Sequence, residues 1–121
     1  MPIYEKITRM AYDTELAYRI RKYLSRIPLI KVHERKMFGG LAFIVNDKMC
    51  VNASRENLMC RFDPLQTKEL EVRKGFLPMT MKGKKHQGYC YVQPEGFKDE
   101  KDFEYWMNLC LKFNERAIKS K

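Results

Sequence analysis

Apolar positions near both ends of the chain recur at helical spacing, and this pattern predicts a helix at each end. The first helix follows Asp13, a residue suited to the N-cap, and ends before Pro28, which disfavours helical backbone at the preceding residue. Its apolar stripe consists of Leu16, Ile20, Leu24 and Ile27. The second helix is predicted over residues 98–119, with acids at its start and bases at its end, as the helix dipole favours.

Between these helices, short runs of apolar or alternating residues predict strands. The runs are 32–38, 41–45, 48–53, 58–62 and 89–92. Asn46-Asp47 tolerates positive φ and therefore closes a hairpin. Asp63-Pro64 begins a short helix that runs to about residue 72, and residues 73–87 are expected to be irregular because glycine and proline interrupt them. The predicted fold is α+β: an antiparallel meander sheet of about five strands, with an N-terminal, a short middle and a long C-terminal helix.

Met37-Phe38-Gly39-Gly40 separates two of the predicted strands. One interpretation is structural: the glycines allow the strand to bend, and Phe38 packs in the core. The other is functional: the glycines form a notch in which a partner docks. We favour the structural interpretation because glycine within a strand usually has a backbone explanation.

Length and charge limit the classes of protein to consider. A chain of 121 residues is expected to form one domain, with residues 1–9 as a flexible extension because helix-capping signals begin only at Asp13. The net charge is +9, which favours acidic partners such as nucleic acid or an acidic protein surface. The sequence contains neither a membrane-spanning apolar stretch nor an apolar signal core, so we expect a cytoplasmic protein without membrane contact.

A basic segment covers residues 73–88. Its cations are Arg73, Lys74, Lys82, Lys84 and Lys85, and no acid lies among them. Three interpretations are open: a solvated loop, a site for a small anion or nucleotide, and a nucleic-acid surface in which Phe76, Tyr89 and Tyr91 stack against bases. The segment between Gly83 and Gly88 is no phosphate-binding P-loop, because Tyr89-Cys90 follows where Lys-Ser/Thr is required.

The cysteines and histidines give no strong catalytic signal. Cys60, Cys90 and Cys110 alternate in phase with apolar neighbours and are expected to be buried, whereas strict alternation exposes Cys50. Pairing of Cys50 with His33 or His86 would resemble a nucleophile and its base, but no motif supports it. Because no CxxC or Cys-His cluster is present, we predict no metal site, no cofactor and no enzymatic activity.

The segment KMFGGLAFIVNDKMCV, at residues 36–51, resembles the signature of the TfoX/Sxy family N-terminal domain. The likeness continues through NLMCRF at 57–62, MKGKKHQGYCYV at 81–92 and the terminal helix, and it spans roughly residues 10–118. It implies a non-catalytic α+β module from a family associated with competence and transcription, acting through a protein regulator or nucleic acid. Two-domain family members carry a second helical domain, and we expect this protein to be a single-domain member, which puts a competence role in doubt. A small-anion or nucleotide binder is the alternative function, and an enzyme is the third.

Overall fold

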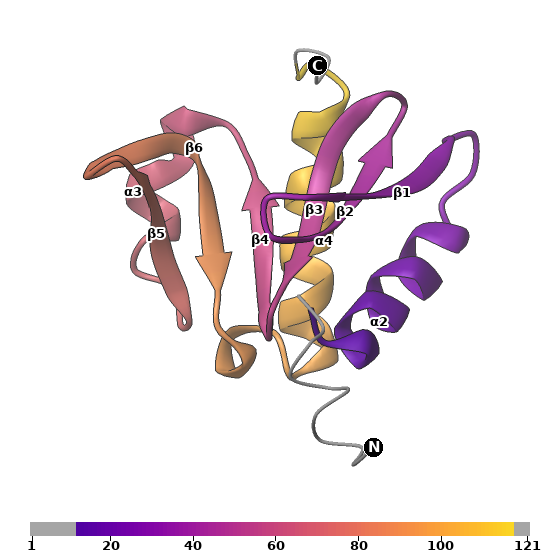
Figure 1. Ribbon diagram of the computed structural model, residues 1–121, viewed down its shortest axis with the longest axis horizontal. Helices are drawn as coiled ribbons and strands as arrows, with labels where there is room; N and C mark the ends of the chain where they lie inside the picture. Colours follow the sequence, from indigo (N-terminus) through magenta and orange to yellow (C-terminus); the bar gives the residue numbers. More distant parts are fainter. Residues whose placement is uncertain (1–11, 118–121) are drawn as a thin grey trace.

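The computed structural model describes residues 12–117 (Figure 1). Its elements are α2 (Thr14–Ser25), β1 (Val32–Met37), β2 (Gly40–Val45), β3 (Lys48–Ser54), β4 (Asn57–Arg61), η1 (Pro64–Gln66), α3 (Thr67–Leu70), β5 (Phe76–Met81), β6 (Lys84–Val92), η2 (Pro94–Gly96) and α4 (Glu100–Asn114). The strands form one antiparallel sheet. The α+β class and its three helical regions are therefore confirmed, while the predicted extension at residues 1–9 lies outside the described part of the chain.

The sheet contains six strands in the order β1-β2-β3-β4-β6-β5. Its first four strands follow one another as in a meander, but β6 lies beside β4 and β5 lies beyond it at the edge. Residues 73–87, predicted to be irregular, thus contain β5 and the beginning of β6. β5 was not predicted from the sequence because Pro78 lies within it. An edge strand tolerates proline, because one side of such a strand needs no hydrogen-bond donor.

Three hairpins close through two residues in left-handed backbone conformation. Asn46-Asp47 has φ of 50° and 69°, as the sequence predicted. Phe38-Gly39 has φ of 55° and 70°, and Lys82-Gly83 has φ of 52° and 79°. Two successive positive φ values are those of a type I′ turn, whose twist matches that of the strands it joins. The bend expected at the glycine pair is therefore a tight turn between β1 and β2.

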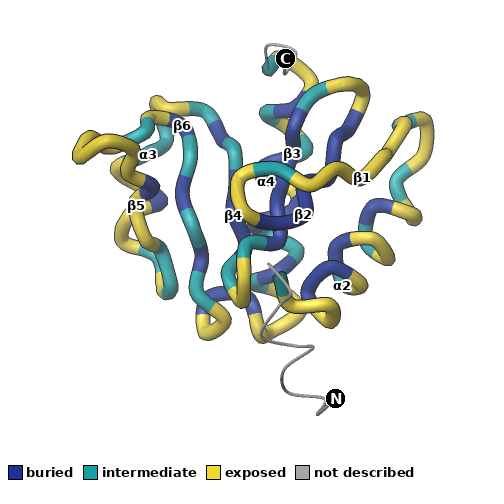
Figure 2. Tube along the Cα trace, viewed as in Figure 1, coloured by how far each residue is buried: buried dark blue, intermediate teal, exposed yellow. Residues whose placement is uncertain are grey.

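The main core lies between the sheet and the helices α2 and α4. Its largest fully buried side chains include Ile20, Leu24, Phe43, Leu58, Phe62, Phe103, Trp106 and Met107. Helix α4 lies behind the central strands in Figure 1, and Figure 2 shows that buried residues dominate these strands. Helix α2 begins as predicted, because the Asp13 carboxylate accepts a hydrogen bond of 2.8 Å from the backbone N–H of Glu15.

The opposite side of the sheet, called the front face here, carries a second apolar cluster. Its buried members are Ala42, Ile44, Met49, Met59 and Met79, and Met37, Tyr89 and Tyr91 pack against them. They are buried without a helix of the described chain over them, because the β1–β2 hairpin crosses in front of the central strands (Figure 1). The sheet therefore has apolar residues on both faces.

The predicted exposure of Cys50 is wrong, since its relative exposure is only 1%. Phe43 of β2 pairs with Val51 and Ile44 pairs with Met49, so β3 contains one residue more than its partner at this point. Such a bulge interrupts strict alternation and turns Cys50 toward the helices together with Val51. The predicted burial of Cys60, Cys90 and Cys110 is confirmed.

Candidate functional site

The hairpin formed by β5 and β6 presents three exposed cations within four sequence positions. Lys82 lies in its turn, and Lys84 and Lys85 begin β6; we call these three residues the lysine tip. All three are exposed, and none forms an ion pair within residues 12–117. Their charges are therefore available to an anionic partner.

Arg73 and Lys74 lie before the start of β5, at the end of this strand away from the turn. A six-residue strand is ~20 Å long, so they do not share one small site with the lysine tip. Arg73 also has partners of its own within the domain. Its guanidinium lies 3.6 Å from the centre of the Tyr105 ring and 4.0 Å from the Asp102 carboxylate. The structure therefore divides the predicted basic patch and attaches Arg73 to α4.

The Met37–Gly40 motif forms the β1–β2 turn and its flanks. The side-chain amide of Asn52, which is fully buried, donates a hydrogen bond of 2.8 Å to the Met37 carbonyl and so fixes this turn to β3. Gly40 allows the close contact, because a Cβ there would lie 2.2 Å from the Ala53 carbonyl oxygen. The glycine thus has a backbone explanation, but the expected burial of Phe38 is wrong: its relative exposure is 38%.

Phe38 instead belongs to an aromatic cluster on the front face. The centre of its ring lies 6.5 Å from that of Tyr89, and His86 stacks on Tyr89 with the ring centres 4.4 Å apart and the planes 22° apart. The guanidinium of Arg61 lies 5.8 Å from the same tyrosine ring. Because His86 follows the lysine tip directly in β6, the fold joins the Met37–Gly40 motif to the basic segment.

The sequence alone indicated only part of this arrangement. It placed Phe76, Tyr89 and Tyr91 near the cations, but Phe76 pairs with Val92 on the helix side and lines a pocket there. It gave no role beside the cations to Phe38, which lies about fifty positions from Tyr89 in the sequence. Only the quoted motif marked Phe38 as unusual, and no local pattern predicts the long-range contact.

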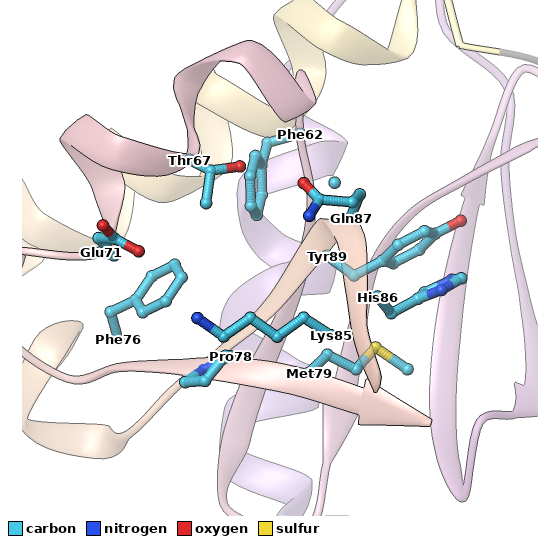
Figure 3. Close-up of a pocket in the computed structure, with 11 residues that line it drawn as sticks. Phe62, Thr67, Glu71, Phe76, Pro78, Met79, Lys85, His86, Gln87 and Tyr89 are labelled. Atoms are coloured by element: carbon cyan, nitrogen blue, oxygen red, sulfur yellow. The ribbon is translucent and has the colours of Figure 1, made fainter. Parts of the chain in front are cut away.

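A small pocket separates the β5–β6 hairpin from η1 and α3. Its volume is about 30 Å³, and the polar residues among those that line it include Thr67, Glu71, Lys85, His86 and Gln87. The Lys85 side chain extends toward Phe76 on the side of the pocket that Glu71 lines (Figure 3). This space suits about one water molecule. It is too small for a nucleotide, and an anion there would face a carboxylate.

The thiols do not form a nucleophilic site with either histidine. Burial raises the pKa of Cys50 well above its ordinary value, and neighbouring Cys110 raises it further. Cys50 faces the helices, whereas His86 stacks on Tyr89 at the front face and His33 is exposed on β1. Within residues 12–117, no group of three or more His, Cys, Asp or Glu residues is arranged to hold a metal ion.

The fold and the site together define a small two-layer α+β domain with a basic hairpin and a partly exposed aromatic cluster. The family model of the TfoX N-terminal domain matches residues 22–114, and the chain belongs to this family. Comparison with curated proteins found no match, and comparison with solved structures found none either. In the described chain, no helix is both long and apolar enough to cross a membrane.

Proposed function

We propose that this domain is a non-catalytic regulatory module that acts in gene regulation, in the cytoplasm, by contacting nucleic acid through the lysine tip and the front face. Membership of the TfoX N-terminal family supports a regulatory role. The position of the lysine tip beside the aromatic cluster carries the proposal, because cations and partly exposed rings together favour a nucleic-acid partner.

The distribution of charge over the sheet supports the same proposal. The six strands contain the bases Arg35, Lys36, Lys48, Arg61, Lys84 and Lys85 but only one acid, Glu34. That acid is neutralised on the helix side, where Arg21 donates two hydrogen bonds to it at 2.6 Å and 2.8 Å. The positive charge of the sheet is therefore not cancelled by carboxylates within it, which attracts a polyanion.

Salt dependence tests the proposal. Fluorescence anisotropy with labelled single-stranded and double-stranded oligonucleotides should show binding that weakens steeply as salt rises. Changing Lys82, Lys84 and Lys85 together to Ala should weaken binding to all sequences alike. It should also lower the log–log salt slope by about 0.7–0.9 for each phosphate that a lysine no longer neutralises.

A matched control uses Lys22, Lys101 and Lys112, three exposed lysines of α2 and α4, changed together to Ala. This variant has the same net charge as the first, so equal weakening in both would show that only overall charge matters. Absence of binding at low salt, or unchanged binding after loss of the lysine tip, contradicts the proposal. In a pull-down with the purified domain, a partner that remains bound after nuclease treatment would instead indicate an acidic protein.

The alternatives have less support. The small-anion or nucleotide interpretation would need the pocket beside Lys85, whose volume of about 30 Å³ and Glu71 lining do not favour either ligand. An enzyme would need a reactive group, and the Cys50–histidine pairing considered from the sequence is not formed. We therefore propose neither of these functions.

A further inference from the structure

We propose that the front face binds single-stranded nucleic acid, with bases stacking on the aromatic cluster of Phe38, His86 and Tyr89 and with phosphates near Lys84 and Lys82 of the lysine tip. This inference rests on the proposed function and narrows its ligand to an unpaired strand. The register of the sheet determines which residues share this face.

One row of paired residues crosses all six strands on the front face. In strand order it contains Arg35, Ala42, Asn52, Met59, Tyr91 and Leu77. No member of the row is acidic, and the cation Arg35 lies at its β1 end. At the other end, Tyr91 is half-buried and Leu77 has a relative exposure of 37%. Ala42, Asn52 and Met59 are fully buried, so the accessible parts of the row are Arg35 at one end and Tyr91 with Leu77 at the other.

The aromatic cluster lies beside the accessible end of this row at Tyr91. Tyr89 is two residues from Tyr91 on the same strand face, and it holds His86 in a near-parallel stack. In Figure 3, the two rings lie together on the side of β6 away from Thr67 and Glu71. Phe38 reaches the cluster from the β1–β2 turn and remains 38% exposed. Partly exposed rings of this kind provide surfaces on which unpaired bases stack.

Lys84 has the position that such a strand requires, whereas the Lys85 side chain extends toward Phe76 on the pocket side of β6. Lys84 pairs with Met81 at the end of the hairpin and lies two residues before His86. A nucleotide stacked on the cluster would therefore have its phosphate near Lys84 and the adjacent turn residue Lys82. A duplex fits this arrangement less well, because its bases are already stacked on one another and cannot stack on the aromatic rings.

The experiment compares three labelled ligands of equal length, about 12 nucleotides, by fluorescence anisotropy at low salt. They are an oligothymidylate, an abasic strand of the same backbone charge, and a duplex. We expect the oligothymidylate to bind most tightly, because only it offers unpaired bases as well as phosphates. Equal binding of the abasic strand, or tighter binding of the duplex, overturns the inference and leaves the proposed function standing. Absence of binding to all three overturns both.

Variants then identify the stacking residues. Phe38→Ala should weaken oligothymidylate binding by about 5- to 150-fold, the range for loss of one stacked base, and should leave the salt slope and the abasic strand unaffected. Tyr18→Ala is the matched control, because Tyr18 is an aromatic residue of α2 that is 59% exposed on the helix side. His86→Ala, which changes a residue of β6 in the same aromatic cluster, should weaken oligothymidylate binding in the same way as Phe38→Ala. If Phe38→Ala and His86→Ala both bind oligothymidylate as tightly as the wild type, and both melt near the wild-type temperature, the assignment of the stacking residues is contradicted.

Discussion

Gly40 shows how a single missing side chain determines the geometry of the sheet. It begins β2 opposite Met37, and its φ lies outside the left-handed region. The requirement for glycine is therefore steric, because a Cβ would lie 2.2 Å from the Ala53 carbonyl oxygen and 2.6 Å from Asn52 Oδ1. The neighbouring Gly39 differs: its φ is +70°, and nothing lies within 4 Å of an added Cβ.

Gly40→Val should destabilise the fold by at least about 3 kcal/mol, the upper end of typical overpacking costs, because the backbone of β3 would have to move. Urea unfolding measures the change in free energy. Gly39→Asn is the control, since asparagine tolerates left-handed backbone and the site is open; its cost should stay below ~1 kcal/mol. If Gly40→Val has the same free energy of unfolding as the wild type, β2 and β3 can move apart at no cost in stability. That result would favour the interpretation of the glycines as a notch in which a partner docks.

At the scale of elements, an ion pair connects α2 to the edge strand β1. Arg21 and Glu34 form two hydrogen bonds, and their side chains are 49% and 32% exposed. The hydrogen bond from Arg21 lowers the pKa of Glu34. Such a pair contributes little in water, typically up to ~1 kcal/mol, but here it attaches a strand of which five residues are exposed.

Glu34→Gln should therefore reduce stability by less than about 1 kcal/mol at neutral pH. Because the folded pKa of Glu34 is lowered, its contribution is fully present above the ordinary carboxyl pKa and disappears as pH falls through the folded value. Urea unfolding of both proteins at about pH 7 and about pH 2 should show the difference only at the higher pH. Glu56→Gln, at an exposed turn position without an ion pair in the described residues, should show no such pH-dependent difference. A constant difference for Glu34→Gln would mean that lost packing, not charge, explains the effect.

At the scale of the whole molecule, charge is divided between its two layers. The strands contain six bases and one acid, whereas the first turn of α4 contains Glu100 and Asp102. The helix layer also neutralises some of its own cations, as in the ion pairs Arg19–Glu100 and Arg116–Asp63. Within the described residues, the bases of the strands therefore exceed the acids by five (six minus one), so the sheet that carries the proposed site is positively charged.

The beginning of the chain offers a prediction at this scale. Asp13 donates its backbone N–H to the Arg55 carbonyl at 2.7 Å and caps α2, and Tyr12 packs against the main core. Removal of residues 1–9 should leave the melting temperature within about 5 °C of the full chain. Removal of residues 1–13 should cost at least the ~1 kcal/mol of a lost cap and lower melting by roughly 4–8 °C per kcal/mol. Circular dichroism measures the melting temperature of each truncated protein. A similar decrease in melting temperature for both truncations would show that residues 1–9 contribute to the fold.

The sequence by itself determined the elements whose signals are local. The Asp13 cap, the apolar stripes and the Asn46-Asp47 turn each depend on neighbouring residues, so helices α2 and α4 and the first four strands were predicted. The family resemblance was also available, because its motifs lie in order along the chain, and it is confirmed over residues 22–114.

Only the tertiary structure decided what depends on pairing between distant segments. The bulge at Cys50 follows from the register with β2, and β5 is a strand because β6 pairs with it at an edge that tolerates Pro78. The contact of Phe38 with Tyr89 arises from the crossing of the β1–β2 hairpin over the sheet. Periodicity reports which residues face the same way within one element, but it contains no information on how elements pack across tens of residues. For that reason the sequence supplied the cations of the candidate site, while the fold supplied the aromatic cluster beside them.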